Sequence, residues 1–236
     1  MKKRLTIAAL AAMAMLGWAG TATAADMPVK APPMAPPPPT WTGMYIGING
    51  GYGFGTSNFS TTGFTTGDFD LRGGLAGVTY GGNWQMGHAV LGFESDFDWA
   101  HINGNVTNVG CGATGVCFTN TRFLSTERMR AGWDFNGWLF YGTLGAAFAD
   151  VNAGVVGCGV GLCGERWRAG WAGGVGIETM FWRNWSAKIE YLHYDLGNSI
   201  QFTPPPAGPA VSVVDRGDII RAGINYHFDL LSLLHF

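Results

Sequence analysis

The stretch NWSAKIEYLHYDL, Asn184–Leu196, alternates apolar and polar side chains with a period of two. One set comprises Trp185, Ala187, Ile189 and Tyr191, and the other comprises Ser186, Lys188 and Glu190. This periodicity predicts a β-strand with an apolar face and a charged face. In a water-soluble protein the apolar face would meet a packed core. Whether this strand has such a core must be judged from the rest of the chain.

The first 24 residues have the pattern of a secretory signal peptide. Three cations precede an uncharged run over residues 5–20, and small residues lead to Ala24. We predict a signal peptide over residues 1–24 that is cut after Ala24. An uncleaved membrane anchor is disfavoured because the uncharged run is shorter than the roughly 20 residues that a spanning helix needs.

Cleavage would leave eleven cationic side chains of the original 14 against 16 acidic ones, a net charge of −5. This balance argues against a nucleic-acid partner. The next segment, MPVKAPPMAPPPPT (27–40), is rich in proline, which favours an extended chain over a packed element. We predict a Pro-rich periplasmic leader over residues 25–40. The remainder is within the size range of one all-β domain.

The composition is unusual for a soluble protein. Charged residues make up only 13% of the chain and aromatic residues 14%, and 38 of the 236 residues are glycine. A soluble protein carries about 25% charged residues. No stretch after the signal peptide is long and apolar enough to predict a membrane-spanning helix. An exported chain of this kind points to a transmembrane β-barrel.

Eight alternating segments are expected, at approximately 42–55, 71–84, 89–100, 121–133, 138–151, 167–181, 184–196 and 216–228. Tight turns at 85–88, 134–137 and 182–184 alternate with long polar stretches at 56–70, 101–120, 152–166 and 197–215. Short periplasmic turns and long external loops alternate in this way in bacterial outer-membrane barrels. We therefore predict an all-β fold over residues 41–228: an eight-stranded antiparallel up-and-down transmembrane β-barrel. An even strand number places both termini in the periplasm.

Aromatic side chains cluster beside the turns and loop ends, as they do in the two girdles of a membrane barrel. The predicted girdle contains Trp41, Trp84, Trp99, Trp133, Trp138, Trp167, Trp182 and Trp185. If the apolar faces meet lipid, the charged faces point into the lumen.

The residues that parity places in the lumen are Glu94, Asp96, Arg128, Arg130, Glu178, Lys188, Glu190 and Arg221, four acids and four bases. Eight strands enclose only enough space for side chains. Because buried charges are tolerable when they are paired, we predict a network of ion pairs that holds the barrel together. The alternative is a narrow porin-like channel for ions or small solutes, since polar membrane interiors sometimes conduct.

Glu127 does not fit this pattern, because the same parity places it on the lipid face. The opposite parity would expose Arg128 and Arg130 to lipid, at about 2–4 kcal/mol each. Three explanations are open: a β-bulge, a position above the hydrocarbon, or a contact with a partner.

Four cysteines lie in two of the long polar stretches, and an even number in an exported chain favours disulfides. Their spacing favours Cys111–Cys117 and Cys158–Cys163, with cross-loop pairing as the rival arrangement. We expect no metal site and no cofactor, because no histidine or carboxylate cluster accompanies these cysteines.

His193 and Asp195 share a face near one end of their strand, where a lipid hydrolase would need a serine beside them. No serine on the neighbouring segments is expected at that height, so we do not predict an enzyme.

Several segments resemble one protein family. WTGMYIGINGGYG (41–53), GWAGGVGIETMFWRNWSAKIEYLHYDLG (170–197) and IIRAGINYHF (219–228) are similar to the small porin-like outer-membrane proteins of α-proteobacteria. These are the surface-antigen and hemin-binding type with an OmpA-like transmembrane barrel. The resemblance implies a bacterial outer-membrane protein that supports the envelope and displays extracellular loops. It also implies lipid and lipopolysaccharide surroundings, and a heme or host ligand at the loops as a distant alternative.

The resemblance further implies that the outer-membrane insertion machinery reads a terminal aromatic residue. Here the candidates are Phe228, which ends the last predicted strand, and Phe236, which ends an extension over residues 229–236. The oligomeric state stays open at this point.

Overall fold

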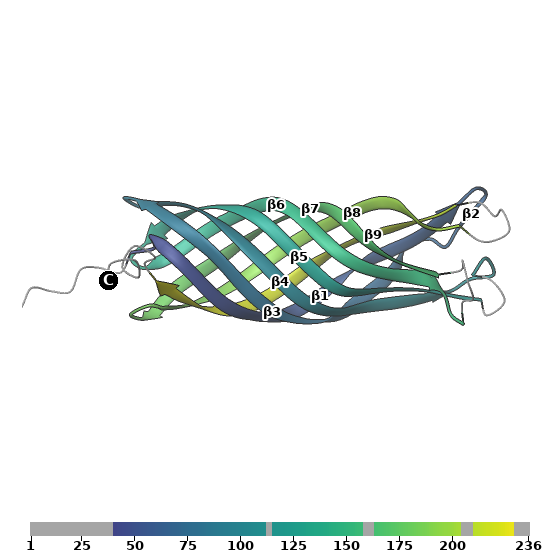
Figure 1. Cartoon of the computed structure of the whole chain (residues 1–236), viewed down its shortest axis with the longest axis horizontal. Coiled ribbons are helices and arrows are strands. Elements are labelled where there is room, and N and C mark those ends of the chain that lie inside the picture. Colours follow the sequence, from purple (N-terminus) through teal and green to yellow (C-terminus); the bar gives the residue numbers. More distant parts are fainter. Residues whose placement is uncertain (1–39, 112–114, 158–162, 204–209, 229–236) are drawn as a thin grey trace, which may run out of the picture. The chain divides into compact units, whose positions relative to one another are not determined.

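The computed structural model describes residues 40–111, 115–157, 163–203 and 210–228. These residues form β1 (Gly43–Thr61), β2 (Phe64–Thr65), β3 (Phe69–Met86), β4 (Ala89–Thr107), β5 (Val116–Phe135), β6 (Trp138–Val155), β7 (Cys163–Trp182), β8 (Trp185–Phe202) and β9 (Val211–Phe228). Each of the eight long strands pairs antiparallel with its neighbour in the chain, and β9 pairs with β1. The sheet is therefore closed into a ring of tilted strands (Figure 1), and the predicted fold is confirmed.

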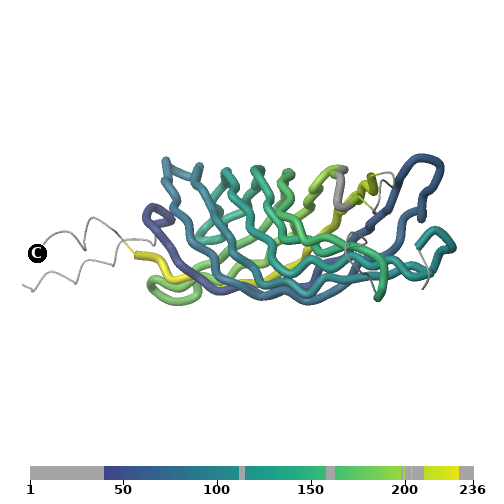
Figure 2. The backbone as a smooth tube through the Cα atoms, turned by 45° about the vertical axis from the view of Figure 1, so that its right-hand side comes forward, coloured from purple at the N-terminus to yellow at the C-terminus, as the bar shows by residue number. Residues whose placement is uncertain are grey.

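The three tight turns lie where the sequence predicts them, at one end of the barrel. The turn between β5 and β6 contains Asn136 and Gly137, with φ of 52° and 84°. Two consecutive residues with positive φ are the requirement of the hairpin turn that matches strand twist, and Asn-Gly is its preferred sequence. The first residues of β1 and the last of β9 lie at this same end, where Met44 pairs with Phe228 (Figure 2). We call it the short-turn end, and the opposite one the long-loop end.

The strands are longer than predicted at the long-loop end. β1 continues to Thr61 instead of Gly55, and β9 begins at Val211 instead of Arg216. The polar stretches that were expected to be loops also alternate, because residues such as Phe59 and Val213 turn inward and are buried. At 18 to 20 residues, the long strands are about twice the length that crosses a bilayer. The barrel wall therefore continues beyond the hydrocarbon.

No helix in the described part of the chain is long and apolar enough to cross a membrane.

Candidate functional site: the filled barrel interior and the outer surface

The interior near the middle of the barrel contains a layer of buried charges. All eight charged side chains predicted to face the lumen are buried there, and Asp98 joins them. Arg128 lies at the centre of this charged layer. Its Nη2 is 2.8 Å from Glu94 Oε1 and 2.6 Å from Asp96 Oδ2, and its Nη1 is 2.8 Å from Glu190 Oε1. One guanidinium thus joins carboxylates from two strands, β4 and β8.

Arg221 makes the second set of cross-barrel pairs, from β9. Its Nη2 is 2.6 Å from Asp96 Oδ2 and 2.5 Å from Glu190 Oε2, and its Nη1 is 3.1 Å from Asp98 Oδ2. Planar guanidinium groups are suited to such shared contacts because their donors lie in a fixed fork. The two arginines share Asp96 and Glu190, so the four groups act as one unit.

Arg130 and Lys188 complete the charged layer nearer the short-turn end. Arg130 pairs with Glu178 and lies 3.4 Å from Glu94, while its guanidinium stacks 3.7 Å from the centre of the Tyr141 ring. The Lys188 Nζ atom is 2.8 Å from Glu94 Oε2. Every cation of the layer therefore has at least one buried carboxylate beside it, which makes its burial tolerable.

Two glycines give the large side chains of this layer their space. A Cβ on Gly81 would overlap the Tyr45 hydroxyl, and one on Gly176 would overlap the Tyr141 ring. Tyr45 donates to Glu94 at 2.9 Å, and Arg130 donates to the Tyr45 hydroxyl at 3.1 Å. Each tyrosine pairs directly with its glycine on the neighbouring strand, so its ring can lie over that strand, where no side chain is in the way.

Nearer the long-loop end, most of the interior is apolar. This apolar layer includes Phe59, Phe69, Leu71, Leu75, Ile102, Leu124, Val151, Leu192, Tyr194, Val213 and Ile219. The sequence interpretation listed only charges inside: it treated the segments of Phe59, Phe69, Ile102 and Val213 as loops, and it did not name the inward apolar residues at the ends of its predicted strands. In the half nearer the short turns, the interior is charged and the outer surface is apolar, as in a membrane protein. In the half nearer the long loops, apolar side chains fill the interior, as in a soluble β-protein.

A smaller group closes the short-turn end and corrects one prediction. Trp41 is 1% exposed and packs with Val90, Leu139 and Tyr141. Its Nε1 donates to Asp134 Oδ1 at 3.0 Å. Trp41 therefore does not belong to the outer aromatic girdle. It precedes the first residue of β1, so strand alternation does not fix its direction, and it folds inward.

The other seven predicted girdle tryptophans are exposed on the outer surface, and Trp171 joins them. We define a short-turn aromatic row by Trp84, Trp133, Phe135, Trp138, Phe140, Phe181, Trp182, Trp185 and Tyr226. We define a long-loop aromatic row by Phe54, Trp99, Phe123, Phe148, Trp167 and Trp171. Exposed aliphatic side chains such as Ile48, Leu144 and Ile224 fill the band between the rows.

Two buried charges near the long-loop end were missed. Arg168 donates through Nη2 to the carbonyl oxygens of Gly197 at 2.7 Å and Val213 at 2.6 Å. Asp215 accepts a hydrogen bond from Thr121 at 3.1 Å. Both face inward by the parity of their strands, so the alternation that located the other lumen residues could have found them.

Glu127 lies on the outer surface, as parity predicted, and the structure removes two of the three explanations for it. It pairs in regular register with Ser95 and Ala146, and the described irregularities of β5 lie at residues 121–123. It lies between Phe123 of the long-loop row and Trp133 of the short-turn row, so it is not above the hydrocarbon band. Its carboxylate accepts a hydrogen bond from the Ser95 hydroxyl.

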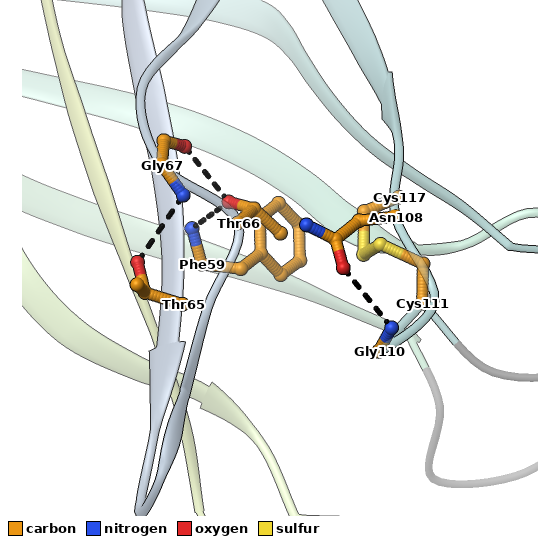
Figure 3. Close-up of a disulfide and its surroundings, with 8 residues drawn as sticks. All are labelled: Phe59, Thr65, Thr66, Gly67, Asn108, Gly110, Cys111 and Cys117. Carbon is orange, nitrogen blue, oxygen red and sulfur yellow. Dashed lines mark hydrogen bonds between the residues drawn. A yellow bond between two sulfur atoms is a disulfide. The ribbon is translucent and has the colours of Figure 1, made fainter.

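The disulfide between Cys111 and Cys117 is present, as predicted, and both residues are buried. It lies beside the Phe59 ring, where the β1–β3 hairpin meets the loop that joins β4 and β5 (Figure 3). The Phe59 amide donates to Thr66 Oγ1 at 3.0 Å, and the Gly110 amide donates to Asn108 Oδ1 at 3.2 Å. Cys163 is also disulfide-bonded, while Cys158 lies outside the described residues, so the second predicted pairing stays a prediction.

His193 has a different partner from the one considered in the sequence. Its Nδ1 is 2.8 Å from Asp218 Oδ1, which also accepts a hydrogen bond from the Tyr191 hydroxyl at 2.5 Å. Asp195 instead accepts from the Gly197 amide at 2.7 Å. Of the two insertion-signal candidates, Phe228 ends β9 and Phe236 lies outside the described residues.

A closed ring of eight long antiparallel strands, an apolar outer band between two aromatic rows and a charged interior together define a transmembrane β-barrel. The family model described as "Outer membrane protein beta-barrel domain" matches residues 8–228, and the chain belongs to this family. It is a bacterial outer-membrane protein.

Relatives of known name agree with this assignment. The chain is 33% identical to the 31 kDa outer-membrane immunogenic protein of Brucella melitensis biotype 1, over 96% of this chain and 100% of that protein. It is 32% identical to the 25 kDa outer-membrane immunogenic protein of Brucella abortus biovar 1, over 91% and 94%. The solved structure of the Escherichia coli outer membrane protease OmpT shares the fold, with a TM-score of 0.50 and 9% identity, over 80% of this chain and 98% of that chain.

Proposed function

We propose that this protein is a structural component of the outer membrane whose barrel is filled and whose long loops face the exterior. The observation that carries the proposal is the filling of the interior at three successive levels. Trp41 and its neighbours close the short-turn end, the charged layer crosses the middle, and the apolar layer lies beyond it. Small barrels of eight strands are commonly filled in this way.

The filled interior argues against the channel alternative. Arg128 and Arg221 each join carboxylates from different strands, so the ion pairs span the lumen. An ion moving along the axis would have to break these pairs and then cross the apolar layer, where Leu71 and Ile102 are fully buried. Such a step is unfavourable because charge transfer into an apolar region costs many kcal/mol.

The proposed orientation places the short turns and both barrel termini in the periplasm. Support comes from the contrast between the ends, since bacterial barrels have short periplasmic turns and longer extracellular loops. The strand extensions beyond the long-loop aromatic row would then hold the loops above the bilayer, in the zone of lipopolysaccharide sugars. The names of the Brucella relatives describe immunogenic proteins, and loops held in this position would be accessible to antibodies.

The proposal requires lipid and lipopolysaccharide around the barrel and the outer-membrane insertion machinery during assembly. It requires no catalysis. The His193 to Asp218 contact is on the outer surface and is explained as a polar anchor near the membrane boundary. A search for mass changes in lipid A after overexpression tests this point, since a modified lipid A would indicate an enzyme.

Conductance in planar bilayers tests the main proposal. We expect the purified, folded protein to insert without producing steady ion currents, and a general porin in the same bilayers controls for the sensitivity of the measurement. Reproducible current steps from the folded protein would overturn the filled-barrel proposal and support the narrow channel.

A further inference from the structure

We propose that the outer surface of β4, β5 and β6 is the contact face of a homodimer in the membrane, centred on Glu127. The first reason is the position of this carboxylate. Among the described residues, Glu127 is the one Asp, Glu, Lys or Arg that points outward between the two aromatic rows. Four other outward charges, Arg72, Asp150, Asp195 and Asp218, each pair with a member of the long-loop row and so lie at that row itself.

The second reason is that the barrel satisfies this carboxylate only in part. The hydrogen bond described for it comes from Ser95, and a hydroxyl supplies one proton to a group that can accept several. Acyl chains carry no donors. Charged side chains inside membranes therefore generally face other protein groups, and they mark functional positions.

The third reason is the shape of the surface around Glu127. The two residues paired directly with it, Ser95 on β4 and Ala146 on β6, are small. On the short-turn side follow Met129 and Leu144, which are 70% and 64% exposed. The large side chains Phe97 and Phe148 lie on the long-loop side. Glu127 and these two small side chains are thus bounded on both sides by rows that contain large apolar side chains.

These three features fit a second copy of the chain. Two copies with the same orientation in the membrane are related by a two-fold axis along its normal, so each residue meets its own counterpart at the same depth. A carboxyl group and a carboxylate can share one proton, so the Glu127 pair needs no cation from the partner. The rows of large side chains of the two copies would meet above and below the Glu127 pair and keep acyl chains away from it.

Two substitutions at Glu127 test the polar contact. Glutamine keeps a donor and an acceptor at this position, whereas leucine suits the lipid surface but removes both. We expect sedimentation equilibrium in density-matched detergent to show dimers of the wild-type protein. Glu127→Leu should raise the dimer dissociation constant at least tenfold, and Glu127→Gln should raise it less. A monomeric wild-type protein at every concentration, or unchanged dimerisation of Glu127→Leu, would overturn the proposal.

Crosslinking in native membranes tests which face is used. A cysteine in place of Met129 lies beside Glu127 on β5, and a cysteine in place of Ile224 lies on β9, the strand opposite β5 in the ring. Met129→Cys should give a disulfide-linked dimer on mild oxidation, and Ile224→Cys should not. Dimers from Ile224→Cys alone, or a crosslink from Met129→Cys only to a different protein, would reject the homodimer on this face.

Discussion

At the scale of single residues, the importance of a charged side chain depends on whether it points into the barrel, as Arg221 and Arg216 of β9 show. Arg221 is buried, and it lies within 3.7 Å of four carboxylates on β4 and β8. A cation in this position stabilises the barrel mainly by preventing uncompensated negative charge, because charges left unpaired in a buried site are costly. Arg216 lies on the same strand but points outward, and it makes one exposed pair with Asp68 at 3.3 Å.

We therefore expect Arg221→Met to lower the free energy of unfolding by about 3–5 kcal/mol, the effect of removing one partner of a buried pair. Arg216→Met is the matched control and should change it by less than about 1 kcal/mol, because exposed pairs contribute little. Urea unfolding in lipid vesicles, followed by tryptophan fluorescence, measures both. Equal effects at the two positions would show that the layer is not essential to stability.

At the scale of the strands, hairpin turns and loop contacts determine how the wall is connected. Gly137 has a φ of 84° in the turn between β5 and β6, a conformation that is strained for other residues. Gly142 lies in β6 itself, and a Cβ added there would approach only one atom, at 3.8 Å. Gly137 is therefore required by its backbone conformation, whereas neither the conformation nor the surroundings of Gly142 exclude a side chain.

Gly137→Ala should lower the free energy of unfolding by about 1 kcal/mol or more, because alanine is strained at positive φ. Gly142→Ala should leave it nearly unchanged. Both are measured by urea unfolding in vesicles, with the rate of refolding as a second reading. A large loss in Gly142→Ala alone would contradict this account of the turn.

The Cys111–Cys117 disulfide acts on one loop at the end of β4 and β5. It packs beside Phe59, in the apolar layer, and it closes a short loop. Replacing both cysteines with alanine should therefore leave the membrane part of the barrel intact and make this loop sensitive to protease, because local openings need not involve global unfolding. Limited proteolysis of intact vesicles, with cut sites mapped by mass spectrometry, checks the expectation. Complete digestion of the barrel would show that the disulfide supports the entire fold.

At the scale of the whole molecule, strand alternation was enough to predict the membrane half. It placed Glu94, Asp96 and Arg128 inside because adjacent side chains on a strand point to opposite faces. It could not give the partners of Arg128, which depend on how far the eight strands are staggered around the ring. It also misplaced Trp41, which precedes β1, and it ended the strands short of the inward residues Phe59 and Val213.

The change in polarity along the barrel predicts where the membrane ends. Leu144 and Asn152 both point outward on β6, but Leu144 lies between the aromatic rows and Asn152 lies beyond the long-loop row. Leu144→Arg should lower the free energy of unfolding in vesicles by about 2–4 kcal/mol, because a cation near the midplane of the bilayer is poorly solvated. Asn152→Arg should change it by less than about 0.5 kcal/mol, since it substitutes a residue in water. If the two variants lost equal stability, hydrocarbon would extend over the polar half of the wall, and the division of the barrel into a lipid-facing half and a water-facing half would be wrong.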